Sequence, residues 1–187
     1  MKYFPLRVLY QGKFLEFVRT GTWEFVRRQG SRPGVLIIPV TDEQRLVVIE
    51  HERPPAAGCV IELPAGTIEC AETVEEAARR ELRQETGFRC SSVERVAEGL
   101  TSPGMTDDRN ILVIARGLVP GEGKAEVVGD GVLKHLRNWG AKGEQERLKV
   151  WEVPLTHIHQ WLATQRQVGK NIDLRLYAGL SFLPPSL

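Results

Sequence analysis

Short apolar runs separated by polar or glycine-containing breaks dominate the first third of the chain. Gly12 and Gly21 punctuate the first three runs, and the polar residues 41–44 separate the next two. The runs are Leu6–Tyr10, Phe14–Val18, Trp23–Val26, Val35–Val40, Leu46–Glu50 and Val60–Leu63. Their length and β-prone composition predict six strands, with a hairpin loop joining the fourth to the fifth.

The spacing of apolar residues changes after Thr73. Val74, Ala77, Ala78 and Leu82 recur at helical intervals, and Gly87 stands where a left-handed turn ends a helix. Further strands are predicted near 93–100, 111–115 and 149–153, and helices at 156–164 and 173–182. Residues 120–143 are rich in glycine and charge, with one helix-like patch at 132–136. The order of elements predicts a mixed α+β fold.

Composition excludes several classes of function. The 187 residues carry 25 Lys+Arg and 24 Asp+Glu, so a net charge of +1 offers no global field for nucleic acid. No apolar stretch is long enough to span a membrane. The N-terminal residues 1–6 lack the apolar core of a secretory signal, and we expect a cytoplasmic protein.

Two glutamates suggest a metal site on the predicted helix. Glu81 and Glu85 are four residues apart, so their side chains share one helix face with Cβ atoms about 5–6 Å apart. Mg²⁺ commonly binds one or two carboxylates together with water and substrate phosphate oxygens. The turn at residues 63–66 can add a backbone carbonyl. The alternative is a solvated helix whose arginines, Arg79, Arg80 and Arg83, neutralise the acidic residues.

The spacing around this helix favours the metal site because it resembles the Nudix box. Gly66 is followed after five residues by Glu72, then after seven by Arg80-Glu81, and the segment closes with Gly87-Phe88. The resemblance implies an α/β/α sandwich with a mixed sheet at residues 35–187, preceded by a small β region at 1–34. It also implies Mg²⁺ or Mn²⁺ ions held by Glu81, Glu85 and the Ala65 carbonyl. Gln84 stands where the box has a glutamate, so as a ligand it would bring an oxygen but no charge.

Two segments resemble the ADP-ribose pyrophosphatase subgroup of that family. The Ser-Pro-Gly sequence within residues 101–108 places Gly104 and Met105 as candidate substrate contacts, although a simple hairpin turn is an alternative. Arg53, in the Arg-Pro-Pro segment before residues 61–66, is a candidate phosphate or ribose contact because a guanidinium can bind phosphate through two donors.

An N-terminal segment adds a third resemblance to the same subgroup. Trp23 can stack on a purine, Glu24 can accept from an exocyclic amine, and Arg28 belongs to the basic pair that follows. In the resembled enzymes these residues are exchanged across a two-fold axis, which implies a homodimer. Trp23 as an ordinary packed strand residue is the alternative.

The general base for hydrolysis is expected in residues 143–150. Attack by water on phosphorus needs a carboxylate that can be delivered to the metal site, and a loop can deliver one on closure. Resemblance to the family's Glu-x-x-x-Val pattern makes Glu146 the first candidate and Glu144 the second. The resemblance thus implies metal-dependent hydrolysis of ADP-ribose, a small nucleoside diphosphate derivative, to AMP and ribose 5-phosphate. Two alternatives stay open: a UDP- or GDP-sugar pyrophosphatase, and a non-catalytic nucleotide sensor.

Overall fold

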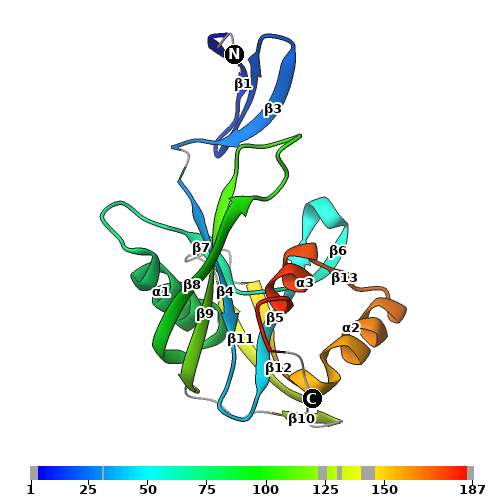
Figure 1. Ribbon diagram of the computed structural model, residues 1–187. Helices are drawn as coiled ribbons and strands as arrows, with labels where there is room; N and C mark the ends of the chain where they lie inside the picture. Colours follow the sequence, from blue (N-terminus) through cyan, green and yellow to red (C-terminus); the bar gives the residue numbers. More distant parts are fainter. Residues whose placement is uncertain (1–3, 31, 122–125, 130–131, 140–145, 185–187) are drawn as a thin grey trace.

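The N-terminal strands form a small antiparallel sheet of their own. The computed structural model describes residues 4–30, 32–121, 126–129, 132–139 and 146–184. Strands β1 (Leu6–Gln11), β2 (Leu15–Thr20) and β3 (Trp23–Arg28) pair in that order. Figure 1 shows this sheet at one end of the molecule, beyond the larger body that holds the helices.

Two larger sheets make up the rest of the strand structure. One has the order β10-β11-β12-β5-β6-β13, and the other the order β7-β4-β9-β8. Neighbours are antiparallel except β4 with β9 and β6 with β13. Their bounds are β4 Gly34–Pro39, β5 Arg45–Arg53, β6 Gly58–Glu62, β7 Ala65–Thr67, β8 Arg89–Leu100, β9 Arg109–Val119, β10 Glu126–Gly129, β11 Val132–Trp139, β12 Glu146–Pro154 and β13 Asn171–Ile172.

Helices cover both sides of these strands. Alternate residues of β4 enter two cores because successive side chains of a strand point to opposite faces. Val35 and Ile37 pack in the core that includes Leu82 of α1 (Val74–Thr86). Leu36 and Ile38 pack in the core that contains Leu162 of α2 (Ile158–Gln167) and Leu176 of α3 (Leu174–Leu180). The expected α+β sandwich is confirmed, with α1 on one side and α2 and α3 on the other (Figure 1).

Two expectations about local structure need correction. The helix-like patch at 132–136 is part of strand β11, which pairs with β12 from Leu133 to Trp139. The pattern of apolar and polar residues over five positions does not distinguish a helix from a strand. Pairing with β12, which is distant along the chain, makes this segment a strand. The loop after β4 leads into β5 as expected, but the two strands do not form an extended hairpin. The isolated bridge Val40↔Leu46 joins them, and β4 and β5 then belong to different sheets.

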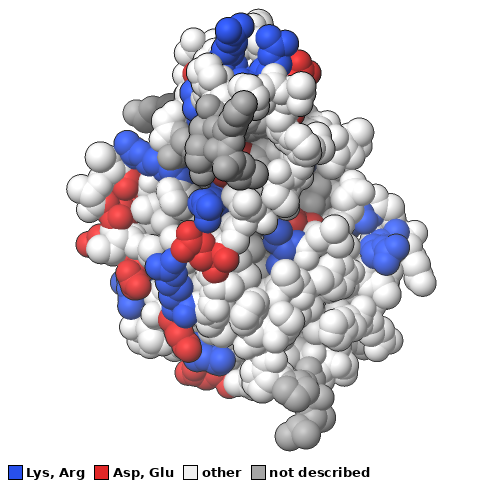
Figure 2. Space-filling model, turned by 45° about the horizontal axis from the view of Figure 1, so that its top comes forward, with Lys and Arg blue, Asp and Glu red and all other residues white. Residues whose placement is uncertain are grey.

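Both signs of charge occur on the face drawn in Figure 2, which also has a broad uncharged area. Basic and acidic side chains are interspersed there, without a broad area of one sign. Within the described ranges, no helix is long and apolar enough to cross a membrane.

Candidate active site

Helix α1 is held firmly at both ends by its local sequence. The Thr73 hydroxyl accepts from the backbone N–H of Glu76, and the Glu76 carboxylate accepts from the N–H of Thr73, which completes a capping box. Gly87 ends the helix in the left-handed region at φ 82°, where its N–H donates to the Arg83 carbonyl. The helix therefore begins and ends where the sequence predicts.

The buried face of α1 carries two carboxylates as well as apolar side chains. Ala77, Ala78 and Leu82 pack on the sheet, while Glu81 and Glu85 are 8% and 4% exposed. Acidic side chains are seldom so buried without partners. The solvated-helix alternative is therefore wrong for these two glutamates.

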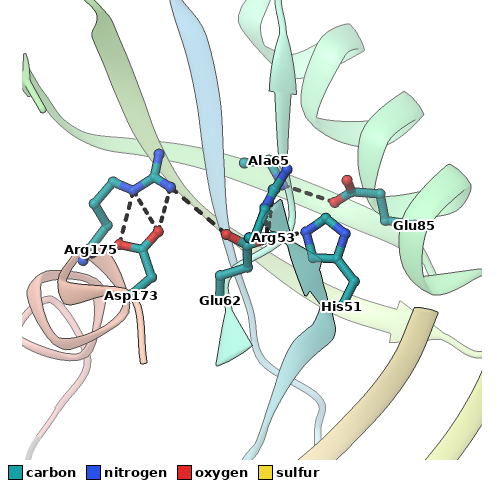
Figure 3. Close-up of polar contacts among 7 residues, drawn as sticks. All are labelled: His51, Arg53, Glu62, Ala65, Glu85, Asp173 and Arg175. Atoms are coloured by element: carbon teal, nitrogen blue, oxygen red, sulfur yellow. Dashed lines mark hydrogen bonds and ion pairs between the residues drawn. The ribbon is translucent and has the colours of Figure 1, made fainter. Parts of the chain in front are cut away.

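Both carboxylates converge on the backbone of β7. The Ala65 N–H donates to Glu85 Oε2 at 3.0 Å, as Figure 3 shows. A Cβ built on Gly66 would lie 1.8 Å from Glu81 Oε1 and 1.9 Å from Glu81 Cδ. Only glycine leaves room for the Glu81 carboxylate at this point. This steric requirement explains why the first residue of the box is a glycine. The structure thus brings together three of the predicted metal ligands: Ala65, Glu81 and Glu85.

Burial makes this pair of carboxylates costly to ionise. Desolvation raises the pKa of Glu85 to about 8, opposed by the Ala65 hydrogen bond and reinforced by the charges of Glu81 and Glu62. Desolvation also raises the pKa of Glu81, although the hydrogen bond from Arg80 opposes it. A cation placed between the two side chains would favour their charged forms.

Arg80 fastens the loop before the helix to the helix itself. Its Nε and Nη2 donate to the two Glu72 oxygens at 2.8 and 2.9 Å, and Nη2 also donates to the Thr67 carbonyl at 2.9 Å. These hydrogen bonds hold the pKa of Glu72 at about 2. Nη1 donates to Glu81 Oε1 at 2.5 Å. One guanidinium therefore joins Glu72 and Thr67 of the loop to the Glu81 carboxylate of the helix.

Gln84 does not join the buried carboxylates Glu81 and Glu85. Its side chain is exposed, and its Oε1 accepts from Arg80 Nη1 at 3.3 Å. Arg80 thus donates to an amide at position 84, where a glutamate would allow an ion pair.

A second polar cluster surrounds Glu62 at the end of β6. Arg53 belongs to it and is predicted from the sequence as a substrate contact, whereas Glu62 is not among the predicted site residues. Glu62 Oε1 accepts from Arg53 Nε and Nη2 at 3.0 and 2.6 Å and is hydrogen-bonded to His51 Nε2 at 2.5 Å. Arg175 Nη2 lies 3.9 Å from Glu62 Oε2 and also pairs with Asp173. Figure 3 shows these side chains beside Ala65 and Glu85. The sequence did offer a sign of this buried site, because Glu62 is an acidic residue inside the apolar run at 60–63.

The N-terminal candidates lie on the small sheet. Trp23 is 58% exposed at the start of β3, and Glu24 and Arg28 are exposed on the same strand. Arg28 Nε lies 3.5 Å from Asp108 Oδ2, and the Val26 N–H donates to the Met105 carbonyl at 2.9 Å. The structure therefore brings the β3 strand and the loop containing Gly104 and Met105 together, at the far end of β8 and β9.

The loop at residues 101–108 is a compact connection between two antiparallel strands. The N–H groups of Met105 and Thr106 both donate to the Ser102 carbonyl at 2.9 Å. Met105 is 70% exposed, and a Cβ added to Gly104 would meet no atom within 4 Å. The loop is thus a hairpin connection that is also accessible to a ligand.

The two candidates for the general base are not placed by the structure. Glu146 is the first residue of β12, where its backbone pairs with Trp139, but its side chain is outside the described part. Glu144 lies outside the described residues altogether. Their roles stay predictions from the sequence.

The fold and the carboxylate helix define a class of protein, and comparison with known proteins agrees. The family model of the NUDIX domain matches residues 30–162, so the chain belongs to the Nudix family. This confirms the resemblance drawn from the box.

Three relatives are about one third identical to this chain over the residues that align. The ADP-ribose pyrophosphatase of Bacillus subtilis (strain 168) is 33% identical over 104 residues, 56% of this chain and 55% of that protein. The methanol dehydrogenase activator of Bacillus methanolicus is 36% identical over 107 residues, 57% and 56%. The ADP-sugar pyrophosphatase of Mus musculus is 32% identical over 117 residues, 54% of each. The matches thus span just over half the length of these relatives.

A solved structure shares the fold over nearly the full chain. A crystal structure of an ADP compounds hydrolase superposes with a TM-score of 0.70 at 20% identity, covering 96% of this chain and 90% of that one. At this level of identity the likeness concerns the fold alone.

Proposed function

We propose that this chain hydrolyses the pyrophosphate bond of a nucleoside diphosphate derivative, with ADP-ribose as substrate and AMP and ribose 5-phosphate as products. The observation that carries the proposal is the convergence of two buried carboxylates, Glu81 and Glu85, on Ala65 and Gly66. The relatives named ADP-ribose pyrophosphatase and ADP-sugar pyrophosphatase support the substrate class.

The donor set suits Mg²⁺ or Mn²⁺. Among the described residues, no three His, Cys, Asp or Glu side chains gather as a metal site on their own. Two carboxylates and a backbone carbonyl are nevertheless enough for Mg²⁺, which completes its octahedron with water and substrate phosphate oxygens. Glu81, Glu85 and the Ala65 carbonyl would hold the ion. When bound, it would neutralise charge on the diphosphate oxygens and lower the pKa of water.

The remaining groups bind substrate and move the proton. Arg53, paired with Glu62, presents a half-exposed guanidinium that is suited to a phosphate oxygen. Glu146 accepts a proton from the attacking water as the new oxygen–phosphorus bond forms. The bond from phosphorus to the bridging oxygen breaks, and the leaving phosphate carries away the bridging oxygen.

We further propose that residues 1–34 form a dimer-forming region. Every residue of β1 is exposed, and large apolar side chains remain uncovered on this sheet. They are Phe4, Leu6, Val8, Leu9, Tyr10, Phe14, Leu15, Phe17 and Trp23. An exposed apolar area of this kind marks an interaction surface, and a second copy would bring Trp23 and Glu24 to a neighbouring site. Light scattering after gel filtration would give twice the chain mass; a monomer would refute the dimer.

The activity is tested by hydrolysis of ADP-ribose beside UDP-glucose, with and without Mg²⁺. The products AMP and ribose 5-phosphate release phosphate when a phosphatase is added, whereas intact ADP-ribose does not. We expect turnover of ADP-ribose that requires Mg²⁺ and is lost in Glu85→Gln. Glu75→Gln, an exposed glutamate in the first turn of the same helix, is the matched control. Preference for UDP-glucose would reassign the substrate, and tight binding without turnover would support a sensor instead.

A further inference from the structure

Glu62 is a buried acidic side chain that the mechanism above does not use. It is 5% exposed, and its partners in the described structure are His51, Arg53 and Arg175. Burying a carboxylate is unfavourable unless hydrogen bonds and opposite charges compensate it. This compensation comes from the end of β5 and from α3, so Glu62 is the point at which these elements meet (Figure 3).

The contact with Arg53 holds one edge of its guanidinium. Nε and Nη2 donate to the same oxygen, Glu62 Oε1, while the Arg53 side chain is 46% exposed. A guanidinium has five N–H donors in a rigid plane, so a carboxylate on one edge directs the donors of the other edge. Glu62 lies three residues before Ala65, and in the view of Figure 3 the held guanidinium lies between Glu62 and Glu85, one of the candidate metal ligands.

Arg175 supports the same carboxylate from the other side. Its Nε donates to both Asp173 oxygens, at 3.1 and 2.8 Å, and Asp173 is the residue that caps the N-terminus of α3. Because Arg175 Nη2 is 3.9 Å from Glu62 Oε2, the position of α3 is coupled to Glu62. Glu62 is thus held from two elements, and Arg53 is held by Glu62. Side chains that are already fixed lose little further conformational entropy when a ligand binds Arg53.

We propose that Glu62 is a positioning residue that orients Arg53 to bind a phosphate of the substrate, with Arg175 as its second support. This inference rests on the proposed function in that the substrate is a diphosphate. A purely structural Glu62 would affect only the stability of the fold. A positioning Glu62 acts through Arg53, and the two roles therefore give different results when Arg53 is absent.

The kinetic test uses Glu62→Gln, which keeps the shape of the side chain and removes its charge. We expect the KM for ADP-ribose to rise roughly tenfold, as for the loss of a charged hydrogen-bond partner, with a kcat that changes less. In an Arg53→Ala background the same substitution should leave KM unchanged. A KM that stays at the wild-type value, or that rises equally in both backgrounds, would overturn the inference.

Glu50→Gln is the matched control. Glu50 is a carboxylate on the neighbouring strand β5, 1% exposed, and it pairs with Lys149 and Lys170 instead of Arg53. We expect its substitution to lower the melting temperature without changing KM. Should Glu62→Gln fail to fold, Glu62→Asp takes its place. It keeps the charge but shortens the reach, with the same expected dependence on Arg53.

Binding of ADP measured by calorimetry separates this inference from the proposed function. We expect the Kd for ADP, in buffer with Mg²⁺, to be roughly tenfold weaker in Glu62→Gln than in the wild type. If the wild type hydrolyses no ADP-ribose but this difference is found, the proposed function fails and the positioning role stands. If hydrolysis is found and neither KM nor Kd changes, the positioning role alone fails.

Discussion

Gly66→Ala tests the placement of the Glu81 carboxylate most directly. The added Cβ would lie 1.8 Å from Glu81 Oε1, whereas ordinary van der Waals contact begins near 3.4 Å. The carboxylate must therefore move by about 1.6 Å, or the β7 backbone must move instead. Metal–oxygen distances tolerate deviations of only about 0.2 Å, so a displaced Glu81 can no longer bind an ion together with Glu85.

The expected effect on activity is much larger than the effect on folding. A misplacement of about 1 Å at a reacting centre costs on the order of 100-fold in rate, and we expect kcat for ADP-ribose to fall by at least that factor. The obstructing atoms belong to the end of a flexible side chain, so overpacking should cost about 1–2 kcal/mol of the free energy of unfolding. For a chain of this size, that corresponds to a melting temperature lower by roughly 2–8 °C.

The assay compares kcat, the Mg²⁺ titration and thermal unfolding for Gly66→Ala and for Gly99→Ala. A Cβ on Gly99 meets no atom within 4 Å, so this control should match the wild type in all three measurements. If Gly66→Ala keeps the wild-type kcat and the wild-type response to Mg²⁺, the Glu81 carboxylate does not act where the structure places it, and the metal-site reasoning is refuted.

Three further predictions concern the base, the box and a buried ion pair. Glu146→Gln should lower kcat by about two to four orders of magnitude if Glu146 takes the proton; near-normal turnover would remove it from that role. Gln84→Glu should lower the Mg²⁺ concentration needed for half-maximal activity, and an unchanged titration would argue against a ligand at this position. Burial of Glu50 disfavours its charge, but hydrogen bonds from Lys149 and Lys170 outweigh burial and lower its pKa below 4.5. A lowered pKa means that ionised Glu50 stabilises the fold above pH 4.5 and that this contribution is lost as pH falls through the folded pKa. Urea unfolding should therefore show the advantage of the wild type over Glu50→Gln shrinking below pH 4.5; a constant difference would contradict the assignment.

Local sequence determined the helix that carries the candidate ligands. The capping box between Thr73 and Glu76, the helical spacing of apolar residues and the left-handed Gly87 act within a few residues of one another. The same is true of Glu81 and Glu85, which share a face because four residues make about one turn. Such features depend on neighbouring residues, so the sequence alone predicts both the helix and the pairing of its carboxylates.

Tertiary structure decided what these carboxylates face and what surrounds them. The contact of Glu81 with Gly66, the cluster around Glu62 and the pairing of β11 with β12 join residues that are distant along the chain. The sequence marks Arg53 as a candidate phosphate contact, but its hold on Glu62 and the support from Arg175 appear only when β5, β6 and α3 meet. Hydrophobic spacing specifies which side of an element is buried; only the packed fold specifies its neighbour there.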